Sequence, residues 1–182
     1  MLLLFAGALF FFWMFNLSSL PLSTAELRKL SNGEDLLDVR LYYTAQEAFR
    51  AMDRYGASGR AWYFRFLAVD FVFLSIYGFA FSLFLTRMTK SLFDQPSPWN
   101  KVNLLPFGIA LADCCENICI LTLLVSYPEQ NLVVGTLAGT ATLIKWLLTV
   151  ITLLCLTVAI IFMLAKRIGF KIHASIGREK NV

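Results

Sequence analysis

Long apolar stretches separated by short polar segments make up most of this chain. Four of them are long enough to cross a bilayer as a helix, which takes about 20 residues, and they cover residues 2–20, 62–86, 104–127 and 132–165. The apolar positions continue without the alternation of barrel strands, and in lipid a segment has to satisfy its own backbone polar groups. The pattern predicts an all-α, polytopic membrane protein, a four-transmembrane-helix bundle that forms one integral membrane domain over residues 1–182.

The composition agrees with this prediction. Hydrophobic residues make up 58% of the chain, charged residues 15%, and the mean hydropathy is +0.68, values far from those of a soluble domain. The formal net charge of +4 and the pI near 9.0 fit a basic rim against an acidic membrane leaflet. We therefore expect membrane lipids as partners, other membrane subunits as a further alternative, and no nucleic acid.

The first apolar segment resembles a cleavable signal peptide, since small residues, Ser18 and Ser19, follow an apolar run. No basic residue precedes that run, however, and it continues through Leu20 and Leu22. Because this length is enough to span the bilayer, we expect an uncleaved membrane anchor.

Positive residues between and after the spans predict the orientation. Short cytoplasmic loops are rich in Lys and Arg, and the loop after the second span carries Arg87, Lys90 and Lys101. The tail, residues 166–182, is also basic, whereas the loop "SYPEQN" between the last two spans has no positive residue. We expect both termini and the tail in the cytoplasm, and the first and third loops outside.

The first outer loop contains a short amphipathic helix at about residues 44–55. Thr44 is its expected N-cap, Glu47 completes a capping box, and Gly56 suits the left-handed position after the last turn. One face is apolar (Ala45, Ala48, Phe49, Met52). We expect this helix to lie flat at the outer surface over the mouth of the bundle, and we favour a packing role over a recognition role.

Four ionisable residues fall near the middle of the apolar spans, namely Asp70, Asp113, Glu116 and Lys145. Each costs about 2.5 kcal/mol or more near mid-bilayer, so such residues normally face inward and find partners. At 1.5 Å per helical residue their depths overlap. Asp113, Glu116 and Asn117 share one helix face, as Asp70 and Tyr77 do on another helix. The sequence therefore predicts one polar cluster in the centre of the bundle.

Within this cluster we predict a direct or one-water pair between Asp113 and Lys145. Glu116, Asp70 and Tyr77 are expected to line a small cavity that opens toward the outer leaflet, with Arg65 as a further neighbour of Glu116. On the lysine helix, the Gly135-x-x-x-Gly139 spacing lets another backbone approach closely.

Three functions remain open. Because three acids exceed what one lysine can neutralise, we favour binding or translocation of a lipid-like or small amphipathic ligand, with Asp70, Tyr77, Asp113, Glu116, Asn117 and Lys145 as the ligand-binding residues. The first alternative is an intramembrane acid/base enzyme acting on a lipid-like substrate, with Glu116, Asp70 and Asp113 as catalytic residues. The second is a structural or accessory subunit of a membrane complex, in which the ion pair fixes helix register.

Metal and cofactor chemistry is not indicated. The four cysteines, Cys114, Cys115, Cys119 and Cys155, form no C-x-x-C motif, and the only histidine, His173, is in the tail. Cysteine also packs well as a small apolar residue. We expect neither a metal site nor a cofactor.

Several motifs resemble those of a family of small four-span bacterial membrane proteins. They are Tyr55-Gly56-x-x-Gly59-Arg60, the Asp70 and Tyr77 pair, Asp113-x-x-Glu116-Asn117, and Lys145-Trp146. The resemblance covers about residues 41–154. It implies a shared fold with a polar centre and a place in the bacterial inner (plasma) membrane, and it implies no particular reaction.

Overall fold

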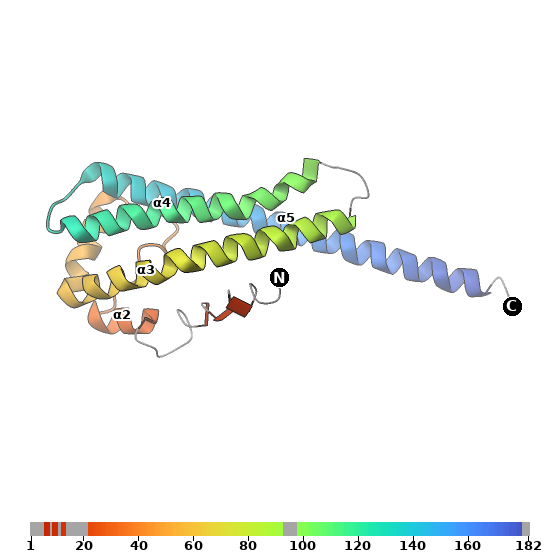
Figure 1. The fold of residues 1–182 in the computed structure, drawn as a ribbon, viewed down its shortest axis with the longest axis horizontal. Helices are drawn as coiled ribbons and strands as arrows, with labels where there is room; N and C mark the ends of the chain where they lie inside the picture. Colours follow the sequence, from red (N-terminus) through yellow and green to blue (C-terminus); the bar gives the residue numbers. More distant parts are fainter. Residues whose placement is uncertain (1–5, 8, 11, 14–21, 93–97, 180–182) are drawn as a thin grey trace.

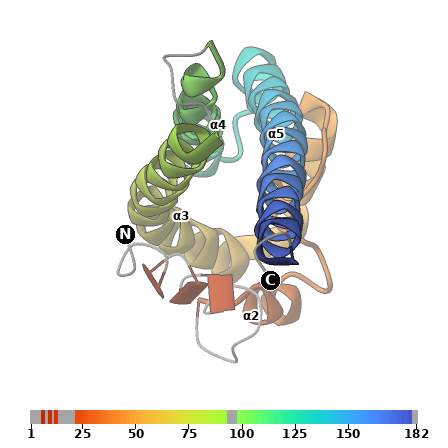
Figure 2. The same cartoon turned by 90° about the vertical axis from the view of Figure 1, so that its right-hand side faces the viewer.

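The computed structural model describes residues 6–7, 9–10, 12–13, 22–92 and 98–179, and within these ranges the chain forms helices and no strand. The elements are α2 (Thr24–Leu30), α3 (Ala45–Leu92), the 3-10 helix η1 (Pro98–Leu104), α4 (Leu105–Ser126) and α5 (Leu132–Glu179). The long helices α3, α4 and α5 lie side by side, and the C-terminal half of α5 extends past the ends of α3 and α4 (Figure 1). Seen end-on, α2 lies on the opposite side of the bundle from α4 (Figure 2).

Three helices of the described ranges are long and apolar enough to cross a membrane. The candidate spans are Ala45–Ser91, Lys101–Ser126 and Leu132–Ala165, and they contain or closely match three of the four predicted spans. Large apolar side chains face outward along α5, with Leu147, Leu154 and Ile161 each more than half exposed, as expected of a surface in contact with lipid. Most of the remaining predicted span, residues 2–20, lies outside the described residues.

The predicted helix of residues 44–55 is present as the first part of α3. Its capping box forms: the Thr44 N–H donates to Glu47 Oε2 at 2.7 Å, and the Glu47 N–H donates to Thr44 Oγ1 at 3.3 Å. Gly56 interrupts the helix with φ +59° and ψ −174°, a conformation that costs glycine little because it lacks Cβ. The chain bends there, which separates a short helix, residues 45–55, from the long part of α3.

The short helix packs against the bundle with its apolar face. Ala45, Ala48, Phe49 and Met52 are each at most 7% exposed. A Cβ added to Gly135 of α5 would lie 2.8 Å from the Cβ of Ala45, so the two elements are already in close contact. The packing role expected of this helix therefore agrees with its position over one end of the bundle.

The connection that leads into the short helix, residues 31–44, also runs against α5. A Cβ added to Gly139 would lie only 1.9 Å from the Tyr43 carbonyl oxygen. The glycine spacing on α5 thus permits a close backbone approach as predicted, and the partner backbone belongs to the stretch Tyr43–Ala45.

On the other side, α2 is anchored to the long part of α3. Leu27 of α2 is fully buried, and its Cδ1 would lie 3.7 Å from a Cβ added to Gly59. Tyr55 donates a 2.6 Å hydrogen bond to the Asp35 carbonyl oxygen, and its ring meets that of Tyr63 edge-on at 5.5 Å. These contacts hold residues 24–38 beside the bundle end that carries the short helix.

Replacing Gly139 with alanine should destabilise the protein, because the added methyl would force the Tyr43 backbone away from α5. We expect a cost of about 1–3 kcal/mol, typical of overpacking in a well-packed site. The matched control is Gly108→Ala on α4, where the new Cβ would meet only Leu148 Cδ1, at 3.4 Å. Thermal unfolding in detergent, followed by circular dichroism, measures both. Equal midpoints for the two variants would contradict this packing.

Candidate functional site

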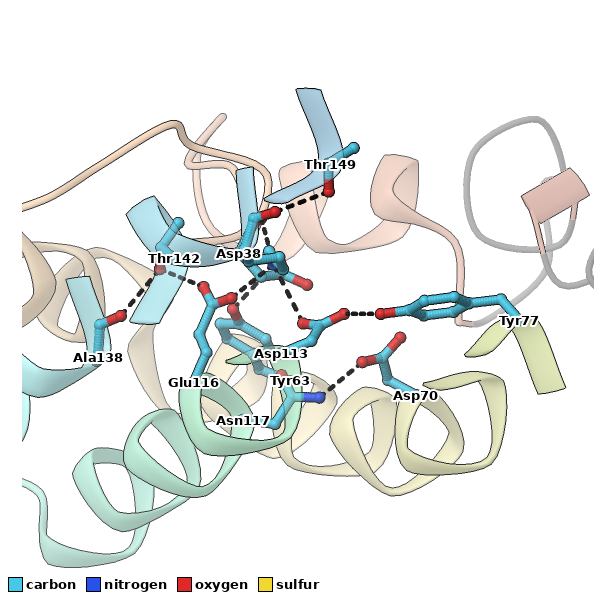
Figure 3. A network of polar contacts seen from close by, with 11 residues as sticks. Asp38, Tyr63, Asp70, Tyr77, Asp113, Glu116, Asn117, Ala138, Thr142 and Thr149 are labelled. Carbon is cyan, nitrogen blue, oxygen red and sulfur yellow. Dashed lines mark hydrogen bonds and ion pairs between the residues drawn. The ribbon is translucent and has the colours of Figure 1, made fainter. Parts of the chain in front are cut away.

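The six predicted site residues come together in one buried cluster between α3, α4 and α5 (Figure 3). Its charged members are nearly inaccessible: Asp70 is 6% exposed, Asp113 9%, Lys145 8% and Glu116 0%. The i, i+3, i+4 spacing on α4 places Asp113, Glu116 and Asn117 on the face that packs against the other helices. The predicted polar cluster is therefore present in the structure, while its ligand-binding role stays a prediction.

Lys145 is the centre of the cluster. Its Nζ lies 3.1 Å from Asp113 Oδ1, which confirms the predicted direct pair, and 2.5 Å from Glu116 Oε2. One ammonium thus serves two carboxylates of α4, one helical turn apart. Removing these charged groups from water costs free energy. Removing one of them from the folded protein is also costly, because its ion-pair partner would stay buried without an opposite charge.

The predicted surroundings of Glu116 are wrong. We expected Glu116 to share a cavity with Asp70 and to have Arg65 near it, but Glu116 pairs with Lys145 and accepts a 2.6 Å hydrogen bond from Thr142 Oγ1. Arg65 donates to the Ala61 carbonyl oxygen of its own helix. The side chain of Glu116 is fully buried, so it does not line an opening to the outside. The position of Glu116 along its helix indicated that it belongs to the polar cluster. It did not indicate that its side chain points to Lys145 and Thr142.

Asp70 and Tyr77 of α3 approach the cluster from the other side. Asn117 Nδ2 donates to Asp70 Oδ2 at 2.7 Å, and the Tyr77 hydroxyl donates to Asp113 Oδ2 at 3.1 Å. Asp113 therefore accepts hydrogen bonds from both Lys145 and Tyr77. Asp70 takes part in no ion pair among the described residues, so its partner is a neutral amide.

The 31–44 segment contributes groups that the sequence analysis missed. Lys145 Nζ donates a 3.0 Å hydrogen bond to the Asp38 carbonyl oxygen, and the Tyr63 hydroxyl donates to Asp38 Oδ1 at 3.3 Å. Burial raises the pKa of the Asp38 carboxyl, the nearby Lys145 ammonium lowers it, and the charge of Asp113 raises it. The sequence carried one signal for this position, the apolar pair Leu36 and Leu37 inside a charged stretch; both are buried.

The amide oxygen of Asn117 is left without a hydrogen-bond donor. Asn117 Oδ1 is buried and accepts no hydrogen bond, although Asn117 is 0% exposed. A buried amide oxygen without a donor costs free energy of about 1–3 kcal/mol. The Tyr43 hydroxyl is buried beside Thr142, and both burial and the nearby Glu116 raise its pKa, so that it stays neutral. The cluster therefore retains unused hydrogen-bonding capacity.

A separate small pocket lies at the end of the bundle, between the short helix and the α4–α5 turn. It combines apolar and acidic side chains, and the Tyr127 hydroxyl donates to Asp53 Oδ1 at its edge, at 3.0 Å. The Arg60 guanidinium stacks 3.6 Å from the centre of the Tyr127 ring. The pocket is lined by Phe49, Met52, Asp53, Leu123, Tyr127, Pro128, Glu129 and Gln130. None of the six predicted site residues lines it.

The described part of the chain contains no group of three or more His, Cys, Asp or Glu side chains arranged to hold a metal ion. Its four cysteines are free thiols, and Cys115 is exposed on the outside of α4. No family model, curated protein or solved structure matches this chain. The resemblance to small four-span bacterial proteins therefore stays a prediction, and the site has to be interpreted from its own geometry.

Removing the central ammonium should be severely destabilising. Lys145→Met would leave Asp113 and Glu116 buried without their cation, at a cost of about 3–5 kcal/mol. Neutralising both acids as well, in the triple variant with Asp113→Asn and Glu116→Gln, should recover much of this loss. Thermal unfolding and yield of folded protein after purification measure both effects. A triple variant no more stable than Lys145→Met would show that charge compensation is not what the lysine supplies.

Proposed function

We propose that this protein binds or translocates a lipid-like or small amphipathic ligand, with the buried cluster as its binding centre. The observation that carries the proposal is the composition of the cluster: acidic side chains outnumber the one lysine, and the buried Asn117 Oδ1 accepts no hydrogen bond. Ionisable groups inside membrane helices commonly mark binding sites or pathways. Apolar helices surround the cluster, an environment suited to a ligand with one polar end.

In the proposed arrangement the chain crosses the bacterial inner membrane four times, with residues 2–20 as the fourth span and both termini in the cytoplasm. The three apolar helices of the described ranges and the basic residues after α3 support this topology. The 31–44 segment and the short helix then lie toward the outside and cover the cluster from that side.

A structural or accessory role is the second candidate, and a specific observation favours it. Lys145 contacts Asp113, Glu116 and the Asp38 carbonyl oxygen, so its hydrogen-bonding capacity of three donors is filled by the protein itself. If the cluster only fixes helix register, purified protein will carry no specific lipid.

Lipid retention tests the proposed function. We expect the protein, purified in a mild detergent, to retain a lipid-like molecule detectable by native mass spectrometry. Asp70→Asn should abolish retention while leaving the protein folded, because the amide keeps a hydrogen-bonding group beside Asn117 but cannot ionise. The matched control is Asp53→Asn, the same change at an exposed acid that accepts a hydrogen bond from Tyr127. An empty parent protein, or retention equal in both variants, would argue against a ligand at the cluster.

Cysteine labelling tests the topology. Asn32→Cys, at an exposed position before the short helix, should react with a membrane-impermeant maleimide in intact cells. Ser175→Cys should react only after the membrane is opened, because the basic tail is expected in the cytoplasm. The parent protein, which has four cysteines of its own, sets the background. Labelling of Ser175→Cys alone in intact cells would show that the proposed orientation in the membrane is reversed.

A further inference from the structure

Acidic groups outnumber positive charges in the cluster by a wide margin. Asp38, Asp70, Asp113 and Glu116 surround Lys145, the one cation of the described residues that forms ion pairs with this group. With all four acids ionised and the lysine protonated, the formal charge of the group would be −3. Uncompensated charge inside a membrane protein is costly, and it is relieved either by protonation of some of these acids or by the entry of further positive charge.

Asp70 is an acid of this group that forms no ion pair among the described residues. The ion pairs of Lys145 go to Asp113 and Glu116, and the polar contact of Asp70 is the 2.7 Å hydrogen bond from Asn117 Nδ2. An amide provides a hydrogen bond but no charge. At 6% exposed, Asp70 also has little contact with solvent that could stabilise its ionised form.

The partner of Asp70 provides a second, independent observation. Asn117 is 0% exposed, and its Oδ1 accepts no hydrogen bond. A carboxylate oxygen and an amide oxygen are both acceptors, so the group that would satisfy them must donate hydrogen bonds. A protonated amine supplies three N–H donors and a positive charge, a hydroxyl supplies one donor and no charge, and a phosphate brings further negative charge.

Residual accessibility indicates the side from which a ligand would approach. Asp70, Asp113 and Lys145 keep 6–9% of their surface exposed, whereas Glu116 and Asn117 have none. The accessible part of the cluster therefore includes Asp70, Asp113 and Lys145, and of these three Asp70 is the one that forms no ion pair among the described residues.

We propose that the Asp70–Asn117 side of the cluster binds the protonated amino group of a cationic amphiphile whose apolar chain lies among the membrane helices. The amine would donate to the Asp70 carboxylate and to Asn117 Oδ1, and its charge would offset the surplus of acids. This inference rests on the proposed function and defines the charge of its ligand.

Binding of three matched probes tests the proposal: dodecylamine, 1-dodecanol and dodecyl phosphate, each added to the purified full-length protein in a non-ionic detergent at pH 7. Native mass spectrometry over a concentration series gives the dissociation constants. We expect dodecylamine to bind at least about tenfold more tightly than the alcohol, as a charge-assisted hydrogen bond in a buried site implies, and dodecyl phosphate to bind most weakly. Equal affinities for amine and alcohol would overturn the proposal, and this comparison needs no variant.

Two substitutions then locate the site. Asp70→Asn should weaken dodecylamine binding about tenfold, to the level of the alcohol, with little effect on the alcohol itself. Asp53→Asn, the same change at the exposed pocket beside Tyr127, should leave all three affinities unchanged. A loss of amine binding in Asp53→Asn and not in Asp70→Asn would assign the amine to that pocket and overturn the inference.

The two proposals can fail separately. If the protein retains a lipid that is lost in Asp70→Asn, yet shows no preference for the amine, the ligand site stands and its cationic specificity is wrong. If no lipid is retained and none of the probes binds, both proposals are wrong.

Discussion

The ammonium group of Lys145 is the constraint on which the rest of this structure depends. It contacts Asp113 and Glu116 of α4 and the carbonyl oxygen of Asp38, so one side chain of α5 connects a neighbouring helix and a loop. A lysine inside an apolar bundle cannot be left without partners. The position of α5 relative to α4, and the path of the 31–44 segment, both have to satisfy it.

That segment is accordingly packed against the bundle and is more than a linker. Its Tyr43 backbone lies against Gly139, where a side chain of any size would prevent the contact. Gly135 does the same for Ala45, the first residue of the short helix. The glycines of α5 allow the segment to approach that helix. Lys145 then donates a hydrogen bond to the Asp38 carbonyl oxygen of the segment.

The cluster has two sides with different chemistry, which separates the two functions that it suggests. Around Lys145 the donors and acceptors of the chain satisfy one another, an arrangement well suited to fixing helix register. Around Asp70 a carboxyl group faces a neutral amide whose oxygen has no partner. A purely structural role accounts for the first side and leaves the cost of the second unexplained, which is why we propose ligand binding at Asp70 and Asn117.

The sequence by itself determined the features that depend on local pattern and on the cost of charge in lipid. These are the apolar helices, the capping box of Thr44 and Glu47, and the six predicted helical residues of the cluster, since helical periodicity and depth are read along one element. Only the tertiary structure decided that Glu116 pairs with Lys145, and that Lys145 donates a further hydrogen bond to the Asp38 carbonyl oxygen. Depth along a helix does not give the rotation of its neighbours, and no periodic pattern describes the path of a loop, so these contacts depend on how separate elements pack.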